Sequence, residues 1–393
     1  MEKKKLIRIT TSDISLNTLI KGQLKYMNQH FEVIGVSNNT GILEAVGKRE
    51  GVRVVEIPMR REISLRNDII CLWKLYKLFL HEKPYIIHAN TPKGSLLSMI
   101  AGKLAGVKHR IYTVTGLRYQ GAFGLFRFLL MSMERISCAC ATKVIPEGNG
   151  VKEALYHDGI TKKNLKVILN GNINGIDVDY FNPSLFTPNQ RTNDKFTGGK
   201  DDIRKDLGLS LDDFVFVFIG RIVRDKGMNE LANCLRKAAE SHVSIKLLLV
   251  GPFETESAPL ADDNENFFKK SNLICYVGNQ KDVRPFLIAA DALVFPSYRE
   301  GFPNVVLQAG AMGIPSIVTN INGCNEIIID GVNGKIIPPK DEDALYNMMM
   351  YFVSQPAEIK KMRKNCRSLI IQRYEQAAVW AAILEMYKSL DNR

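Results

Sequence analysis

The feature that most constrains this sequence is a regular alternation between short β-branched runs and longer helix-like stretches. The runs LIRIT, FEVIGVS, VRVVEI, YIIHA and RIYTV are separated by segments with the residue spacing of helices. Strands joined through helices form a parallel sheet with helices on both faces. The first half of the chain is therefore predicted to be a doubly wound α/β domain.

The alternation stops in a stretch rich in Pro, Asn, Thr, Gly and charge, FNPSLFTPNQRTNDKFTGGKDD, and restarts with FVFVFIG. A chain of 393 residues exceeds what one hydrophobic core usually serves. We predict domains at residues 1–180 and 213–375, a linker at 181–212, and a C-terminal helix at 376–393 that packs back on the first domain. The expected architecture is two Rossmann-like domains facing each other across a cleft, with ligands beyond the carboxyl ends of the strands.

The net charge of +12 lies entirely in the first half of the chain. Residues 1–180 hold 27 Lys and Arg against 15 Asp and Glu, and the remainder holds 26 of each. A basic half is compatible with nucleic acid, an anionic membrane or a phosphorylated substrate, so motifs must decide among them.

Targeting signals and disulfides are not indicated by the sequence. Arg8 and Asp13 interrupt the first apolar run before a signal peptide can form, and no uncharged stretch has the length of a membrane span. The seven cysteines are scattered and are expected to be reduced thiols. We expect a soluble, cytoplasmic protein.

The first chemical motif is GRIVRDKG at residues 220–227, directly after an apolar strand. Gly220 permits close approach of a ligand, and Arg221 and Lys226 lie near the start of a predicted helix. The paired N–H donors of Arg221, the positive charge of Lys226 and the helix dipole together suit a diphosphate. A solvated basic turn is the alternative interpretation.

The second motif, PSYREGFPNVVLQAG at residues 296–310, also follows a strand. Pro303 is predicted in the first helical turn, which leaves backbone N–H groups near the helix start for an anion or a sugar. These N–H groups belong to Gly301, Phe302 and Asn304. Gln308 interrupts an otherwise apolar helix and needs partners, either ligand hydroxyls or neighbouring backbone.

Metal sites and nucleic-acid motifs are not predicted. Asp177 and Asp179 match the letters of a D-x-D motif but fall at the linker, so we interpret them as structural. The six histidines show no ligand spacing, and only His88, at the end of YIIHA, lies where a cleft would be. It can touch a sugar or be a buried strand-end histidine.

Two segments of the basic half mix apolar and basic residues. They are residues 117–130, LRYQGAFGLFRFLL, and residues 69–80, IICLWKLYKLFL. Both suit a membrane face. The alternative is that both are core helices whose cations reach out to solvent.

The two chemical motifs together resemble the retaining glycosyltransferases of family 4, which have the two-domain GT-B fold. GRIVRDKG is similar to that family's phosphate loop, and EGFPNVVLQAGAMGIPSIVT to its E-x7-E helix and the following strand. NGID at residues 174–177 and the run at 323–334 are further matches. HANTPKGSLLSMIAGKLAGVKHRIYTVTG resembles the branch of undecaprenyl-diphosphate-sugar N-acetylhexosaminyltransferases.

The resemblance implies roles for individual residues. Arg221 and Lys226 bind the donor diphosphate, Glu300 lies at the transferred sugar, and these three form the catalytic set. Gln308 stands where the family has a second glutamate that binds ribose. The expected donor-binding residues are Gly220, Arg221, Lys226, Glu300, Gly301, Phe302, Pro303, Asn304, Val305 and Gln308. The expected acceptor-side residues are Thr11, Ser12, His88, Lys93, Thr115 and Arg118.

The function implied by the resemblance is transfer, with retention, of an N-acetylhexosamine from a UDP-sugar to a lipid-diphosphate-linked sugar in surface polysaccharide or capsule biosynthesis. The enzyme is expected to use no cofactor or metal, to bind no nucleic acid, and to be peripheral on the inner face of the cytoplasmic membrane. Gln308, Asn90 and Thr115 depart from the family pattern, which leaves open a catalytically impaired sugar-nucleotide-binding subunit. A UDP-sugar 2-epimerase is a further alternative with the same architecture.

Overall fold

The computed structural model describes residues 3–188, 196–241, 243–254 and 258–391. The chain divides into two compact units, one formed by Met1–Gly175 with Gln376–Arg393 and the other by Ile176–Glu375. The C-terminal helix α16 (Gln376–Lys388) thus belongs to the first unit.

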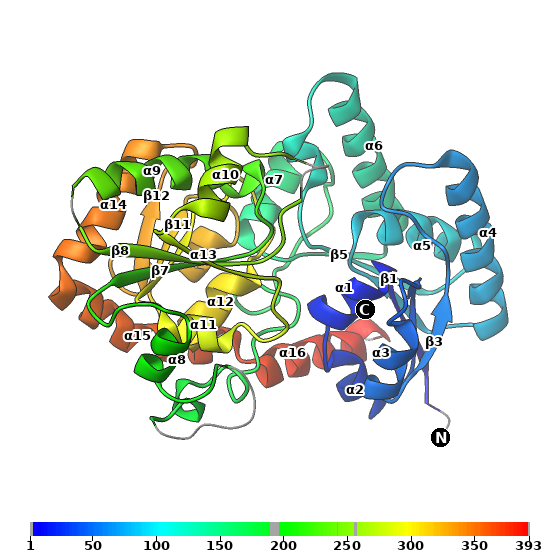
Figure 1. Ribbon diagram of the computed structural model, residues 1–393. Helices are drawn as coiled ribbons and strands as arrows, with labels where there is room; N and C mark the ends of the chain where they lie inside the picture. The colour runs from blue at the N-terminus through cyan, green and yellow to red at the C-terminus, as the bar shows by residue number, and fades with distance from the viewer. Residues whose placement is uncertain (1–2, 189–195, 242, 255–257, 392–393) are drawn as a thin grey trace. The chain divides into compact units, whose positions relative to one another are not determined.

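The first unit is built on a six-stranded parallel sheet of order β3-β2-β1-β4-β5-β6 (Figure 1). Its strands are β1 (Lys5–Ser12), β2 (Glu32–Asn38), β3 (Arg53–Glu56), β4 (Ile86–Ala89), β5 (His109–Val114) and β6 (Lys143–Pro146). Ile7 of β1 pairs in register with Ile34 on one side and with Ile87 on the other. Consecutive parallel strands require crossover connections, and the alternating helices provide them.

Helices cover both faces of this sheet. They are α1 (Asp13–Leu19), α2 (Gln23–Asn28), α3 (Leu43–Glu50), α4 (Leu65–Glu82), α5 (Pro92–Leu104), α6 (Gly124–Cys140) and α7 (Asn149–His157), with 3-10 turns η1 (Arg118–Gly121) and η4 (Ser389–Asp391). Helix α5 packs between α4 and α6, whereas α16 packs against α2. Because side chains alternate along a strand, Ile7 and Ile9 join one hydrophobic cluster and Leu6 joins another.

The second unit repeats the architecture, with sheet order β12-β11-β10-β7-β8-β9. Its strands are β7 (Phe214–Ile219), β8 (Ile245–Val250), β9 (Ile274–Gly278), β10 (Ala292–Phe295), β11 (Ser316–Thr319) and β12 (Gly334–Ile337). Its helices are α8 (Lys200–Asp206), α9 (Met228–Glu240), α10 (Asp262–Lys270), α11 (Arg284–Ala289), α12 (Asn304–Ala311), α13 (Cys324–Ile327), α14 (Glu342–Ser354) and α15 (Pro356–Tyr374), with 3-10 turns η2 (Pro183–Leu185) and η3 (Arg224–Lys226). The predicted α/β class is confirmed.

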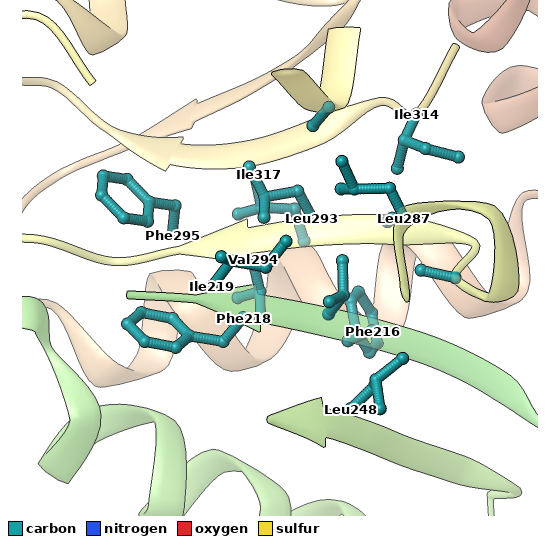
Figure 2. Close-up of a cluster of buried hydrophobic side chains, with 14 of the residues drawn as sticks. Phe216, Phe218, Ile219, Leu248, Leu287, Leu293, Val294, Phe295, Ile314 and Ile317 are labelled. Atoms are coloured by element: carbon teal, nitrogen blue, oxygen red, sulfur yellow. The ribbon is translucent and has the colours of Figure 1, made fainter. Parts of the chain in front are cut away.

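The centre of the second unit is a continuous apolar layer (Figure 2). Phe216 and Phe218 of β7 pack beside Leu293 and Phe295 of β10, and the rings of Phe218 and Phe295 stack with centroids 6.1 Å apart. Strands covered by helices on both faces are apolar throughout rather than alternating. This explains the unbroken run FVFVFI.

The predicted linker at residues 181–212 is partly folded structure, and residues 189–195 of it lie outside the described residues. Helix α8 buries Ile203 and Arg204 against the second unit. Arg204 Nη2 lies 2.6 Å from Asp291 Oδ2, and its Nε donates to the Ala289 carbonyl at 2.8 Å. A long-range ion pair of this kind leaves no trace in local turn propensity, so α8 was not predicted from the sequence.

Candidate active site

The two predicted motifs lie side by side, because β7 and β10 are neighbours in the sheet and each motif follows one of them. The Tyr298 N–H donates to the Asp225 carbonyl at 2.9 Å. Arg299 Nη2 pairs with Asp225 Oδ2 at 2.7 Å. The loop at residues 220–227 and the loop at 296–303 therefore form one surface at the carboxyl edge of the sheet.

Glycines permit the close approach of these loops. A Cβ on Gly227, which has φ +70°, would lie 2.1 Å from the Pro296 carbonyl oxygen. A Cβ on Gly251, at φ +139°, would lie 1.9 Å from the Gly220 carbonyl oxygen. Any larger residue at either position would separate the strand ends, so the geometry of the edge depends on them.

The start of α12 is enclosed by a third loop. A Cβ on Gly323 would lie 2.6 Å from the Gly301 carbonyl oxygen, and Phe302 and Pro303 are buried. Pro303 precedes α12 as its N-cap rather than lying in its first turn, a shift of one residue from the prediction. Phe302 and Pro303 therefore contribute backbone position to the site rather than side-chain contacts.

Lys226 and Glu300 join the two motifs through an ion pair between Lys226 Nζ and Glu300 Oε1. Ser297 Oγ donates to the same carboxylate oxygen at 2.8 Å. Both charged side chains are largely buried, with 16% of each exposed. The pair holds an ammonium and a carboxylate together at the sheet edge, where a phosphate oxygen can compete with Glu300 for Lys226.

Arg221 extends from the end of β7 towards the segment after β8. Its Nη1 lies 2.8 Å from Glu254 Oε2, and half of its side chain (51%) is exposed. Exposed ion pairs of this type are weak. Arg221 can exchange Glu254 for a phosphate at little cost.

Gln308 lies one turn after Asn304 on α12, on the same side of the helix, and is partly exposed. Within the described part of the chain, its side-chain amide has no hydrogen-bond partner. The sequence left two alternatives for this amide, ligand hydroxyls or neighbouring backbone. The structure, over the residues it describes, does not contain the hydrogen bonds to neighbouring backbone. Val305 beside it is also only partly buried.

On the acceptor side, Thr11 and Ser12 lie at the end of β1 and are engaged within the first unit. Thr11 Oγ1 accepts from the Gly94 N–H at 3.0 Å, and Ser12 Oγ accepts from the Ile14 N–H at 3.3 Å. Both are buried. They shape the loop that begins α1.

His88 and Lys93 are also turned into the first unit. His88 is hydrogen-bonded to the Tyr387 hydroxyl at 2.5 Å and to Thr113 Oγ1 at 2.7 Å, and burial together with the Arg8 charge holds its pKa well below the usual range. Lys93 Nζ lies 2.8 Å from Asp68 Oδ1 and is buried. Their buried positions therefore do not favour the ligand contacts that were predicted for His88 and Lys93.

Thr115 and Arg118 are the predicted acceptor-side residues that reach the surface. Thr115 is partly buried and its Oγ1 donates to the Asn90 carbonyl at 2.7 Å. Arg118 is exposed, and its Nη1 donates to the Arg61 carbonyl at 3.2 Å. Both lie after the carboxyl end of β5.

Sequence reasoning missed Ser297 and Glu254. A serine three residues before a glutamate is a recognisable local hydrogen-bonding pattern, so Ser297 could have been found. Glu254 lies 33 residues from its partner Arg221, and no sequence signal connects them.

The structure also gives observations on metal ligands, on Asp177 and on the length of the helices. Among the residues described, no group of three or more His, Cys, Asp or Glu is placed to hold a metal ion. Asp177 Oδ1 instead accepts from the Tyr180 N–H at 2.9 Å, as in a turn. The described helices include none that is long and apolar enough to cross a bilayer.

A hollow of about 1150 Å³ also lies in the second unit, beyond β9. It is lined by Tyr276, Asn279, Lys281 and Arg284 together with Leu185 and Phe186, among others. None of the predicted donor-binding residues lines it.

Two open parallel sheets, with a basic loop and a carboxylate at the carboxyl edge of the second, are the arrangement expected of the GT-B glycosyltransferases. The family comparisons agree. Residues 17–173 match the model of "Glycosyltransferase Family 4", and residues 199–369 match that of "Glycosyl transferases group 1". The chain belongs to the glycosyltransferases that combine these two domains, and it is a hexosyltransferase.

Relatives extend over nearly the whole chain. The chain is 28% identical to the capsular polysaccharide biosynthesis glycosyltransferase CapM of Staphylococcus aureus, over 99% of this chain and 98% of that protein. It is 29% identical to the UDP-Gal:alpha-D-GlcNAc-diphosphoundecaprenol alpha-1,3-galactosyltransferase of Escherichia coli, over 93% and 92%. The crystal structure of Anabaena Alr3699/HepE in complex with UDP and glucose shares the fold, with a TM-score of 0.77 at 18% identity over 99% of this chain and 100% of that one.

Proposed function

We propose that this chain transfers an N-acetylhexosamine from a UDP-sugar to a sugar carried on undecaprenyl diphosphate, with retention of configuration, in the biosynthesis of a surface polysaccharide. The observation that carries the proposal is the Lys226–Glu300 pair at the junction of the two loops, with Arg221 at the end of the adjoining strand. The name of the S. aureus relative supports a role in polysaccharide biosynthesis, and the name of the E. coli relative supports the acceptor class.

Binding of the donor would rearrange two ion pairs. A donor phosphate replaces Glu300 as the partner of Lys226, and it replaces Glu254 as the partner of Arg221. Glu300, still held by Ser297, is then free to accept hydrogen bonds from hydroxyls of the transferred sugar. Gln308 is available for a ribose hydroxyl because its amide is not engaged within the described chain.

The same cations serve the chemical step. As the bond between the sugar and UDP breaks, negative charge develops on the leaving phosphate, and Lys226 and Arg221 stabilise it. A leaving phosphate oxygen takes the proton of the acceptor hydroxyl as that hydroxyl attacks from the same face. This route needs no protein base, which agrees with the buried, hydrogen-bonded state of His88.

A membrane surface is the proposed place of the reaction, because the acceptor is a lipid. The start of α6 carries Phe123, Leu125 and Phe128 with 86%, 90% and 64% of their surfaces exposed. Helix α4 has exposed Leu65, Ile69, Trp73 and Leu80 along one side. These apolar residues, together with the basic excess of the first half, favour a peripheral position on the cytoplasmic face of the membrane.

The donor assignment is tested by Arg221→Ala and Lys226→Ala. Each change removes a charge-assisted contact with the diphosphate, so each should weaken UDP binding about tenfold or more and slow transfer further. Isothermal titration with UDP and turnover of a radiolabelled UDP-sugar measure the two effects. If both variants keep the affinity and the rate of the unmodified chain, the donor diphosphate does not bind at this loop.

A panel of UDP-N-acetylglucosamine, UDP-N-acetylgalactosamine, UDP-galactose and UDP-glucose tests the sugar. We expect the two N-acetylhexosamines to be the substrates, and transfer restricted to the neutral hexoses would contradict this. The alternative of a sugar-nucleotide-binding subunit, raised by Gln308, Asn90 and Thr115, predicts UDP binding without turnover of any of the four.

A further inference from the structure

The surface of the first unit at the carboxyl ends of β3 and β5 carries exposed arginines that the donor chemistry does not use. The segment after β3 contains Arg60 and Arg61, and η1, after β5, begins with Arg118. Arg118 Nη1 donates to the Arg61 carbonyl at 3.2 Å, so the two loops touch and bring these guanidinium-bearing residues together. All three arginines are exposed.

The positive charge of these arginines is not neutralised within the unit. None of Arg60, Arg61 and Arg118 forms an ion pair with a residue that the structure describes. Glu62 is the acidic residue of this loop, and it too is exposed. Three clustered cations beside one acidic side chain repel one another and create a local field that favours an anion.

The loop that carries Arg60 and Arg61 is held in place by side chains of α4 and α5. Lys93, at the start of α5, donates from its Nζ to the Glu62 carbonyl and pairs with Asp68 of α4 at 2.8 Å. Asn67 Nδ2 donates to the Pro58 carbonyl at 3.0 Å. These contacts fix the backbone of the loop, so less ordering is needed when an anion binds.

The exposed apolar start of α6 adjoins the arginines. Phe123 and Leu125 follow Arg118 in the same loop and its helix, with η1 packed against α6. Arg127, on the first turn of α6, lies 3.7 Å from Asp158 and is already partly neutralised. A ligand with an apolar chain and an adjoining group of high negative charge would contact both features at once.

We infer that Arg61 and Arg118, with Arg60 beside them, bind the diphosphate of the lipid-linked acceptor, while its polyprenyl chain lies along the start of α6. This inference rests on the proposed function and adds a site for the part of the acceptor that does not react. Guanidinium groups suit this ligand because they bind phosphate oxygens through paired N–H donors. The position also fits the rule that ligands bind beyond the carboxyl ends of parallel strands.

The test compares two kinds of vesicle. One is neutral phosphatidylcholine containing a small fraction of undecaprenyl diphosphate, and the other is phosphatidylcholine with phosphatidylglycerol at the same total charge. The variant is Arg61→Gln with Arg118→Gln. The matched control is Lys25→Gln with Lys48→Gln, which removes the same charge from exposed positions on α2 and α3. These helices cover the face of the sheet opposite the one that α4, α5 and α6 cover.

We expect the arginine variant to bind the diphosphate vesicles at least tenfold more weakly than the unmodified chain, and the lysine variant to bind them normally. On phosphatidylglycerol the two variants should behave alike. Equal binding of the arginine variant to diphosphate vesicles would overturn the inference. So would an equal loss on both kinds of vesicle, because the arginines would then recognise phospholipid headgroups in general.

Two further readouts separate this inference from its premises. UDP affinity and the circular dichroism spectrum should be unchanged in the arginine variant, which shows that it is folded. If the unmodified chain transfers sugar to the lipid and the arginine variant does so with the same KM for the acceptor, the site is wrong and the proposed function stands. If the unmodified chain transfers no sugar at all, the proposed function itself fails.

Discussion

At the scale of single residues, the candidate site consists of cations paired with carboxylates, which the proposed donor would displace. Lys226 is paired with Glu300 and Arg221 with Glu254. The sequence predicted Arg221, Lys226 and Glu300 because they occur in short motifs with recognisable spacing. It could not predict Glu254, since that contact depends on how β7 and β8 end beside each other.

The Arg221–Glu254 pair leads to a prediction for Glu254→Gln. Because Glu254 would compete with the proposed donor phosphate for Arg221, its neutralisation should strengthen UDP binding two- to fivefold, the range expected for an exposed pair of up to about 1 kcal/mol. Titration calorimetry with UDP measures the change. Glu240→Gln, at an exposed position at the end of α9, is the control for charge alone and should have no effect. Unchanged or weaker binding by the Glu254 variant would mean that Arg221 does not face the diphosphate.

At the scale of elements, the alternation of strands and helices was sufficient to predict both sheets, because the period of side-chain burial is a local property of each segment. Long-range contacts were not predictable in this way. Helix α8 is fixed by the Arg204–Asp291 pair. The buried ring of His88 is hydrogen-bonded to the hydroxyls of Tyr387 and Thr113. Whether α4 and α6 are core helices or surface helices also depended on what packs against them.

The exposed start of α6 predicts a role in membrane binding. Replacing Phe123 and Leu125 with Ser removes two side chains that are 86% and 90% exposed and would be buried in the interfacial region. Binding to anionic vesicles in a sedimentation assay should fall at least tenfold. The control is Leu104→Ser with Leu211→Ser, which changes exposed leucines outside this surface. If both double variants sediment equally well, α6 does not contact the bilayer.

A buried carboxyl on α6 gives a prediction for pH. Burial raises the pKa of Glu134 to about 7, above its usual value of 4.5, and the Tyr112 hydroxyl donates to it. The native state therefore holds the proton more tightly than the unfolded chain. The resulting stability is present below pH 4.5 and is lost as the pH rises through 7, with a total of about 3 kcal/mol.

Glu134→Gln should remove this dependence, so the variant should gain stability relative to the unmodified chain as the pH rises from 5 to 8. Both tryptophans, Trp73 and Trp380, lie in the first unit, so urea unfolding followed by tryptophan fluorescence reports on that unit. Glu44→Gln, at an exposed position on α3, is the control. If the difference in stability between Glu134→Gln and the unmodified chain is constant from pH 5 to 8, Glu134 does not titrate in this range.

At the scale of the whole molecule, the two units carry different parts of the chemistry. The second holds the cations and the carboxylate of the proposed donor site, and the first holds the basic and apolar surfaces proposed for the lipid acceptor. The family domains follow the same division, with the family 4 match at residues 17–173 and the group 1 match at residues 199–369. Transfer by the proposed route therefore requires both units, and Lys226 and Arg221 would stand in place of a metal ion at the leaving diphosphate.

The most direct test is transfer of a radiolabelled sugar from UDP-N-acetylhexosamine to an undecaprenyl-diphosphate-linked sugar by the complete chain in excess EDTA. We predict a labelled lipid product with the anomeric configuration of the donor, formed at the same rate with and without chelator and lost in Lys226→Ala. UDP binding without a lipid product from any of the four UDP-sugars would contradict the account. So would a product that forms only when Mn²⁺ or Mg²⁺ is restored.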